Sequence, residues 1–181
     1  LLYGKKDILN KLPNQNHEFL EGDVPYTLNP GGPNHEELSC LIGVYEYFNN
    51  LYEHHFPGQD ASTRGKIEAV NELIAKHEME IANPLLDYIN TRDDINLIGK
   101  TKISNKDRAP TIAFTMNNKS SKELSSDLVK QGIATRNDNF YAWRCLKALG
   151  IDTDDGVVRT SMVHYNTHED VSNLINALKT I

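Results

Sequence analysis

The hydrophobic positions between residues 34 and 90 recur every three or four residues, which is the spacing of one face of a helix. The first helix is predicted to begin at Asn34, where the run Asn-His-Glu-Glu has the spacing of a capping box. A longer amphipathic helix follows over residues 61–90, and Pro84 is expected to kink it or divide it in two. The apolar stripes are Leu38, Leu41, Ile42, Tyr45 and Phe48 in the first helix, and Ile67, Val70, Leu73, Ile74, Ile81, Leu85 and Ile89 in the second.

From residue 95 onward the pattern changes to short apolar runs that alternate with short amphipathic segments. The order is β-β-α-β-α-β-α, which predicts an α/β chain whose small α+β domain packs helices on one face of a small mixed or antiparallel sheet. Capping boxes at Ser120 and Thr167 mark two of the helix starts. The expected strands are 95–99, 110–116, 133–136 and 157–163, and the expected helices are 120–132, 141–149 and 167–179.

The beginning of the chain has a different character. Leu1-Leu2-Tyr3-Gly4 is typical of the end of a buried strand, so we expect the chain to begin in the middle of a domain. Residues 13–33 are rich in Asn, Pro, Gly and Asp and predict a long loop, which in compact domains is often functional. We therefore predict three parts: residues 1–60, a connecting helix over 61–94, and a small domain over 95–181.

The charge balance narrows the classes of partner. A net charge of -6 and a pI near 5.6 argue against a nucleic-acid-binding or polybasic membrane surface. A small molecule or a protein is the expected partner. The sequence has no apolar run of membrane-spanning length and no signal-peptide pattern at its start. We expect a soluble cytoplasmic protein.

Histidine and cysteine residues do not predict a metal site. His54 and His55 are neighbours that cannot share one face of a helix, and His35 has no histidine four residues away. Cys40 and Cys145 have no metal-ligand spacing, and we expect both to be buried small apolar residues. For Cys145 a reactive thiol is the alternative, because the expected helix places two basic residues beside it.

One arginine lies inside the apolar run Val157–Val163. A guanidinium there must meet an anion or reach water, because burial without a partner is costly. Arg159 could pair with an internal Asp or Glu, or lie at a sheet edge with its charged end in solvent. The functional alternative is a clamp for a carboxylate, whose two oxygens match the planar fork of guanidinium donors.

A pair of glycines precedes the helix that begins at Asn34. Backbone amides of Gly31 and Gly32, together with the first turn of the helix, could hold an anion. The alternative is a flexible turn followed by a helix cap, since the spacing is that of neither a dinucleotide-binding nor a Walker loop.

Taken in order, these segments resemble the C-terminal half of the class V aminotransferases, and among them the cysteine desulfurase-like enzymes of pyridoxal 5′-phosphate (PLP) fold type I. The resemblance covers nearly the whole chain, and its most specific part runs from Arg159 to Thr167. The segments are Gly-Gly-Pro-Asn before a helix, a long helix, Pro-Thr-Ile-Ala-Phe, Gly-Ile-Ala-Thr-Arg, and Val-Val-Arg-Thr-Ser-Met-Val-His-Tyr-Asn-Thr.

The resemblance implies roles for individual residues. Arg159 would bind the α-carboxylate of an amino-acid substrate. Gly31 and Gly32 would approach the cofactor phosphate of a partner subunit in a homodimer, although Gly32 replaces the family's threonine and its hydroxyl contact. Tyr141 occupies the position of the desulfurases' sulfur-accepting cysteine, and a phenol does not take up sulfane sulfur as a thiolate does. Cys145 lies one helical turn later.

The resemblance also indicates what these residues lack. It makes residues 1–60 the closing piece of a large PLP-binding domain, and it places the lysine that forms the Schiff base with PLP before Leu1. Lys5 and Lys6 come too late to replace that lysine. We therefore expect this segment alone to be inactive and the intact chain to be a PLP-dependent lyase or transferase. The alternative function is a non-enzymatic α/β module that binds a ligand or a protein.

Overall fold

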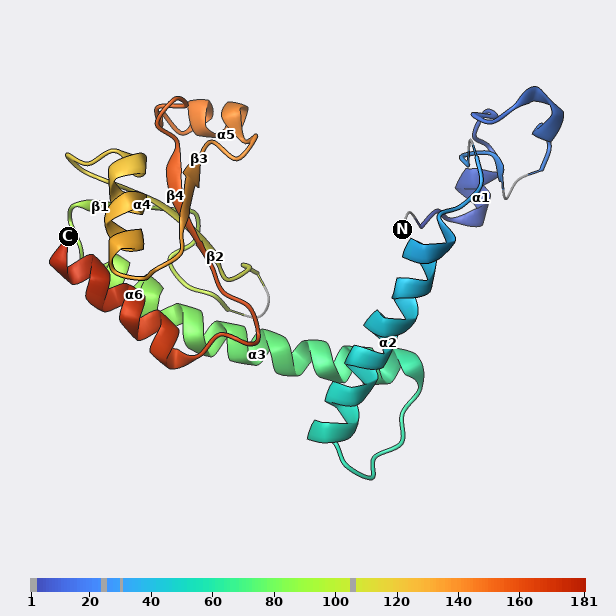
Figure 1. Ribbon diagram of the computed structural model, residues 1–181, viewed down its shortest axis with the longest axis horizontal. Coiled ribbons are helices and arrows are strands. Elements are labelled where there is room, and N and C mark those ends of the chain that lie inside the picture. Colours follow the sequence, from blue (N-terminus) through green and yellow to red (C-terminus); the bar gives the residue numbers. More distant parts are fainter. Residues whose placement is uncertain (1–2, 24–25, 30, 105–106) are drawn as a thin grey trace. The chain divides into compact units, whose positions relative to one another are not determined.

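The computed structural model describes residues 3–23, 26–29, 31–104 and 107–181. The chain forms two compact units, residues 1–67 and 68–181, and each is described here by itself. The boundary lies near the start of the long helix α3, Thr63–Ile89 (Figure 1). The division of the chain into three parts stays a prediction.

The first unit consists mainly of the helix α2, His35–His55, preceded by the short helix α1, Lys6–Leu9, and the 3-10 turn η1, Glu18–Leu20. The predicted start of α2 is confirmed, because the Asn34 side chain accepts a hydrogen bond from the Glu37 amide at 3.0 Å. The predicted strand at residues 1–4 falls partly outside the described residues, and Tyr3 and Gly4 form no strand.

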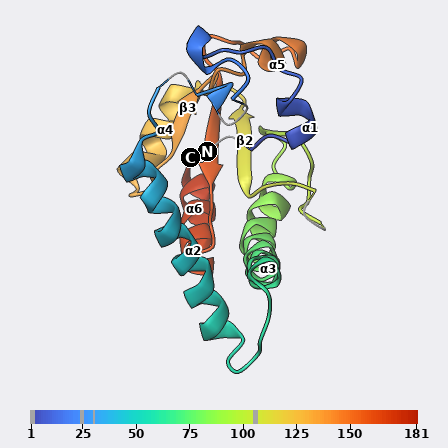
Figure 2. The ribbon, with the colours of Figure 1, turned by 90° about the vertical axis from the view of Figure 1, so that its right-hand side faces the viewer.

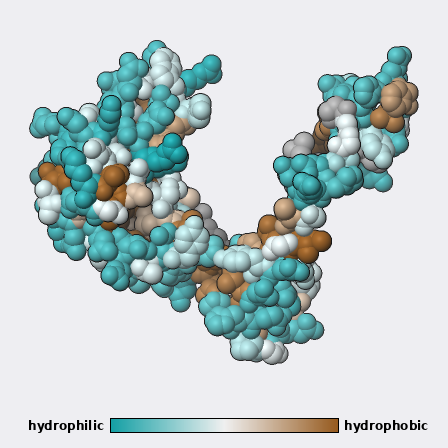
Figure 3. Space-filling view, viewed as in Figure 1, coloured by the Kyte–Doolittle hydropathy of each residue, from teal (hydrophilic) through white to brown (hydrophobic). Residues whose placement is uncertain are grey.

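Much of the apolar surface of α2 is exposed, and hydrophobic patches are visible along this helix (Figure 3). Tyr52 is its one buried residue. Near it, Lys66 donates to Glu53 at 2.5 Å and to Asn49 at 3.0 Å. The exposed apolar residues of α2 are Leu38, Leu41, Ile42, Val44, Tyr45 and Tyr47.

The helix α3 continues without interruption through Pro84, so of the two expected effects of this proline, a kink or a division, the division is not found. Proline removes one backbone donor from the helix, but Ile81 and Leu85 on either side of it are fully buried. Burial of the apolar stripe thus outweighs the lost hydrogen bond. In addition, the Asn83 side chain bonds both the amide and the carbonyl of Ile103, at 3.0 and 3.2 Å.

The second unit contains a four-stranded sheet, and of the two predicted alternatives, mixed or antiparallel, it is antiparallel. Its strands are β1, Ile95–Ile98; β2, Thr111–Met116; β3, Arg136–Asp138; and β4, Val157–Ser161, in the spatial order β1-β2-β4-β3. The third strand begins at Arg136, whereas the sequence predicted it over 133–136. Ile133, the most apolar residue of that stretch, instead packs against the core from the connection after α4.

Three helices cover one face of this sheet (Figures 1 and 2): α3; α4, Ser121–Lys130; and α6, His168–Thr180. Side chains from all three join Phe114 of β2 and Val158 of β4 in one core cluster. Of the three predicted capping boxes, those at Ser120 with Glu123 and at Thr167 with Asp170 are present, whereas at Asn34 only the bond from the Glu37 amide to the cap side chain is formed. The short helix α5, Trp143–Ala148, lies within the predicted span 141–149.

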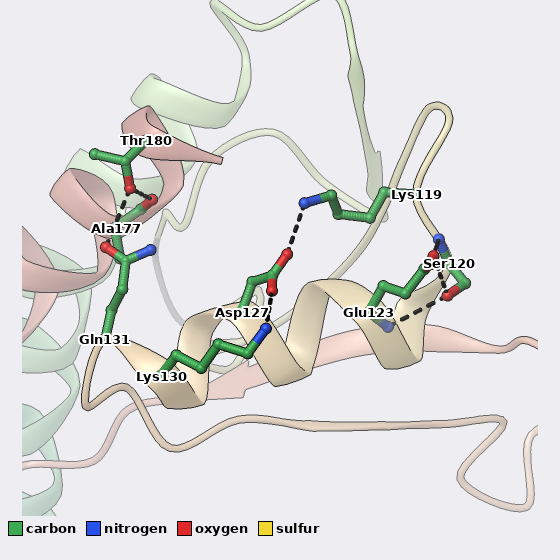
Figure 4. A network of polar contacts seen from close by, with 8 residues as sticks. All are labelled: Lys119, Ser120, Glu123, Asp127, Lys130, Gln131, Ala177 and Thr180. Carbon is green, nitrogen blue, oxygen red and sulfur yellow. Dashed lines mark hydrogen bonds and ion pairs between the residues drawn. The ribbon is translucent and has the colours of Figure 1, made fainter.

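A polar network fixes α4 from its start to its end (Figure 4). The Asp127 carboxylate bridges Lys119 at 2.7 Å and Lys130 at 2.8 Å. Beyond the last turn of α4, Thr180 of α6 donates to the side chain of Gln131 at 3.1 Å. These contacts join α4 to the strand connection before it and to the C-terminal helix.

Candidate functional site

The position of Arg159 follows from the alternation of side chains along β4. Val158 and Thr160 are buried on the helix-covered face, so Arg159, between them, lies on the opposite face of the sheet. Its cross-strand partners are Ala113 on β2 and Arg136 on β3. Ala113, Arg136 and Arg159 therefore lie on the same face of the sheet. Arg159 is therefore on an inner strand and half-buried, rather than at an edge of the sheet.

Arg159 forms no ion pair or hydrogen bond through its side chain with any residue that the structure describes. The internal Asp or Glu considered from the sequence is thus not found in the described ranges. Instead, the guanidinium carbon lies 3.9 Å from the centroid of the Phe140 ring. Stacking on an aromatic ring leaves the donors at the edge of the guanidinium open to an anion.

The loop that carries Phe140 has an unusual backbone. Phe140 and Tyr141 have φ angles of 50° and 60°, in the left-handed region that non-glycine residues rarely occupy. Asn139 holds the loop: its side chain accepts from the Tyr141 amide at 3.1 Å and donates to the Thr153 carbonyl at 3.3 Å. Tyr141 is fully exposed. Strained backbone of this kind is often found at functional sites.

The other end of β4 leads into a corner before α6. The Asn166 side chain accepts from the Val163 amide at 2.9 Å, and Thr167 caps the helix. His77 of α3 lies 2.8 Å from the Asn166 carbonyl through its Nε2 atom. Nearby, burial raises the pKa of Glu78, and two neighbouring histidines oppose that shift. The corner is therefore anchored to α3 as well as to α6.

Gly31 and Gly32 lie at the start of α2 as expected, while Pro30 falls outside the described residues. A Cβ added at either glycine would meet no atom within 4 Å, so the surrounding space is open to a ligand. Backbone amides before and in the first turn of a helix are the groups that commonly bind a phosphate. However, Glu36 and Glu37 lie in the first turn and partly offset the positive end of the helix dipole.

The two cysteines differ from the sequence prediction. Cys40 and Cys145 are both free and exposed, so the expectation that they are buried apolar residues is wrong. Cys40 lies on the exposed side of α2, and Cys145 lies in a short helix with one buried residue, Leu146. In the described part of the chain, no group of three or more His, Cys, Asp or Glu residues could hold a metal ion.

One cavity lies away from Arg159. It measures about 720 Å³ and is lined by α3 residues from Asn71 to Met79 together with Ile103 and Arg108–Pro110. The Arg108 guanidinium there donates to the backbone carbonyls of Lys100 and Ile98. The Arg159 side chain makes no such hydrogen bond with the described residues, and we place the candidate site at Arg159 for this reason.

Sequence reasoning missed Phe140 and the opposition of Arg136 to Arg159. The contact of Phe140 with Arg159 joins a loop to a strand nineteen residues later in the sequence. The opposition of Arg136 to Arg159 depends on the register between β3 and β4. In the described residues, no helix is long and apolar enough to cross a membrane.

Comparisons with known proteins converge on one family. The model of the aminotransferase class-V family matches residues 67–174, more than half of the chain. The aminotransferase-like protein FGM3 of Gibberella zeae is 30% identical over all of this chain, which covers 42% of that protein. A protein named probable cysteine desulfurase from Staphylococcus epidermidis is 24% identical over 99% of this chain and 40% of its own length.

A solved structure has the same fold. The crystal structure of the cysteine desulfurase CsdA from Escherichia coli matches with a TM-score of 0.67 and 22% identity, over 98% of this chain and 41% of that chain. The chain thus spans about two-fifths of the length of the curated relatives that it matches.

Proposed function

Because the chain belongs to the class V aminotransferase family, we propose that it forms the C-terminal part of a PLP-dependent enzyme that acts on an amino acid. The observation that carries this proposal is Arg159, a half-buried guanidinium whose side chain has no acidic partner in the described part of the chain. A carboxylate is the anion that its fork of donors fits best. Arg159 therefore binds the α-carboxylate of the substrate.

Arg159 contributes binding and orientation. Two parallel hydrogen bonds from one guanidinium hold a carboxylate in a defined plane, which restricts how the rest of the amino acid lies. PLP, when bound, supplies the electron sink for the reaction. The lysine that attaches PLP belongs, in this proposal, to the part of the relatives' length that these 181 residues do not span, so the segment alone is inactive.

Gly31 and Gly32 have a separate role in this proposal. The space around them is open, and their backbone amides would hold the phosphate of the cofactor bound by a partner subunit in a homodimer. A side-chain hydroxyl does not assist, since position 32 is glycine. A cytoplasmic location is part of the same proposal.

Tyr141 bears on which type of reaction the enzyme catalyses. Tyr141, fully exposed on the strained loop, stands where the resemblance places a desulfurase's sulfur-accepting cysteine. Its phenol does not accept sulfur, so we propose a desulfurase-like lyase or transferase without assigning cysteine as the substrate.

The test uses the complete protein that contains this chain. Arg159→Ala should weaken the binding of L-alanine by about 10- to 100-fold, the loss expected for a charged bidentate contact. The visible absorbance of bound cofactor should stay intact. Arg144→Ala, which removes the same charge from the exposed side of α5, is the matched control and should leave binding unchanged.

Unchanged L-alanine affinity in Arg159→Ala would remove the clamp from the proposal. A complete protein without visible cofactor absorbance would favour the other candidate, a non-enzymatic α/β module that uses Arg159 to bind a ligand or a protein.

A further inference from the structure

We propose that Phe140 is a positioning residue that holds the Arg159 guanidinium in the orientation that receives a carboxylate. This inference rests on the proposed function of Arg159 and adds a residue to it. The ring centroid of Phe140 lies 3.9 Å from the guanidinium carbon, which is the separation of a stacked pair. A ring at this distance supports one flat side of the guanidinium and leaves the edge donors free.

The support matters because the other neighbours of Arg159 do not fix it. Arginine has a long flexible side chain, and a free guanidinium loses much of that freedom when it binds a ligand. Its neighbour across β3 is Arg136, which has the same charge, and like charges placed directly opposite each other repel. Its neighbour across β2 is Ala113, which is too small to orient it. Phe140 thus provides the one stacking contact described for this side chain.

The loop is built in a way that places this ring over Arg159. Phe140 adopts a φ of 50°, and its neighbour Tyr141 a φ of 60°, conformations that are unfavourable for both residues. The hydrogen bonds of Asn139 to Tyr141 and Thr153 compensate for that strain. The amide of Ala142 also donates to the Asn139 carbonyl at 2.8 Å.

A backbone contact at Gly156 also fixes this loop against β4. The backbone of Gly156, directly before β4, packs against the backbone of Asp138 and Asn139, directly before Phe140. The loop and the strand that carries Arg159 are therefore held together at the base. The position of Phe140 relative to Arg159 is thereby set by backbone contact rather than by the side chains alone.

The experiment measures the affinity of the complete protein for two probes, L-alanine and L-alaninamide, by calorimetric titration. L-Alaninamide has an amide where L-alanine has its carboxylate. Phe140→Leu removes the ring and keeps an apolar side chain, and it should weaken L-alanine binding by about 5-fold, as expected for a partly shielded cation–π contact. Binding of L-alaninamide should change by less than about 2-fold, because this probe offers no carboxylate to the guanidinium that Phe140 orients.

Two further variants separate positioning from a general effect on the loop. Phe140→Tyr keeps the ring and should bind L-alanine as the unmodified protein does. In the Arg159→Ala background, Phe140→Leu should cause no further loss, because the ring then has nothing to orient. Equal weakening of both probes, or weakening by Phe140→Tyr as well, would overturn the inference.

The outcomes also distinguish this inference from the function on which it rests. If Arg159→Ala weakens L-alanine binding and Phe140→Leu does not, the carboxylate clamp stands and the positioning role is wrong. If Arg159→Ala itself leaves L-alanine binding unchanged, the proposed function fails and the positioning role fails with it.

Discussion

Gly156 packs directly against the backbone of Asp138, so that a Cβ at position 156 would overlap the Asp138 carbonyl group and lie 2.8 Å from the Asn139 amide nitrogen. Gly156 also has a φ of 72°, which disfavours any residue with a side chain. Two separate effects therefore require glycine at this position. The contact joins the end of β3 to the start of β4, the strand that carries Arg159.

Gly156→Ala should accordingly be strongly destabilising. The left-handed backbone costs an alanine about 1–2 kcal/mol. Overlap with the Asp138 backbone should add about 1–3 kcal/mol, as in other overpacked sites. Gly150→Ala is the matched control: Gly150 has a φ of 71°, but a Cβ there meets no atom within 4 Å. Equal losses in the two variants, measured by denaturant unfolding, would show that the close approach contributes nothing.

Substitutions at two neighbouring residues of α4 can test which face of this helix packs in the core of the second unit. Leu128 is fully buried, while Val129 beside it is 57% exposed. Leu128→Ala should lower the free energy of unfolding by about 2–5 kcal/mol, because it leaves a cavity in the core. Val129→Ala should change it by less than about 0.5 kcal/mol, as is usual at the surface. A small effect of Leu128→Ala in chemical denaturation would contradict the assignment of this face to the core.

The capping box at the start of α6 can be tested with a pair of conservative changes. The Thr167 side chain accepts from the Asp170 amide at 3.2 Å, and the Asp170 carboxylate accepts from the Thr167 amide at 2.8 Å. Thr167→Ala should cost about 0.5–2 kcal/mol of stability, because a helix-end donor loses its partner. Thr167→Ser keeps the hydroxyl and should be close to neutral. A thermal unfolding scan in which both variants behave alike would be incompatible with capping by this hydroxyl.

The Asp127 bridge on α4 predicts a dependence of stability on pH. Hydrogen bonds from Lys119 and Lys130 lower the pKa of Asp127 from 3.8 to about 2. A carboxyl whose pKa is lower in the folded state stabilises the fold above its unfolded pKa, and this contribution disappears as the pH falls through the folded pKa. Asp127→Asn should therefore lower the melting temperature slightly at pH 7, and the difference from the unmodified chain should vanish between pH 4 and about 2.

The control for the Asp127 prediction is Asp93→Asn. Asp93 has the same charge and lies in the second unit, and its carboxylate makes no contact recorded in the described residues. The Asp93→Asn substitution should not change the melting temperature in the same range of pH. A constant difference between Asp127→Asn and the unmodified chain from pH 7 to pH 2 would show that the bridge to the two lysines contributes nothing.

The elements that the sequence predicted correctly carry local signals. The starts of α2, α4 and α6 are marked by Asn34, Ser120 and Thr167, whose side chains bond amides three residues away. The apolar stripes and alternating runs likewise depend on residues close together in the chain, and they were sufficient to predict helices on one face of a small sheet, although not to choose between a mixed and an antiparallel one. The order of the quoted segments, of which the motif around Arg159 is the most specific, was sufficient to recognise the family.

Other features required contacts between distant segments. The sequence could not place β3 three residues later than its apolar run, because pairing with β4 selects the register. It could not show that α3 persists through Pro84, since that depends on the burial of Ile81 and Leu85 against the sheet. Local sequence patterns reflect the hydrogen bonds and the apolar face of a single helix or strand. The free energy of packing depends instead on which helices and strands contact one another in the fold. The stacking of Phe140 on Arg159 arises from such a meeting, and tertiary structure alone determined it.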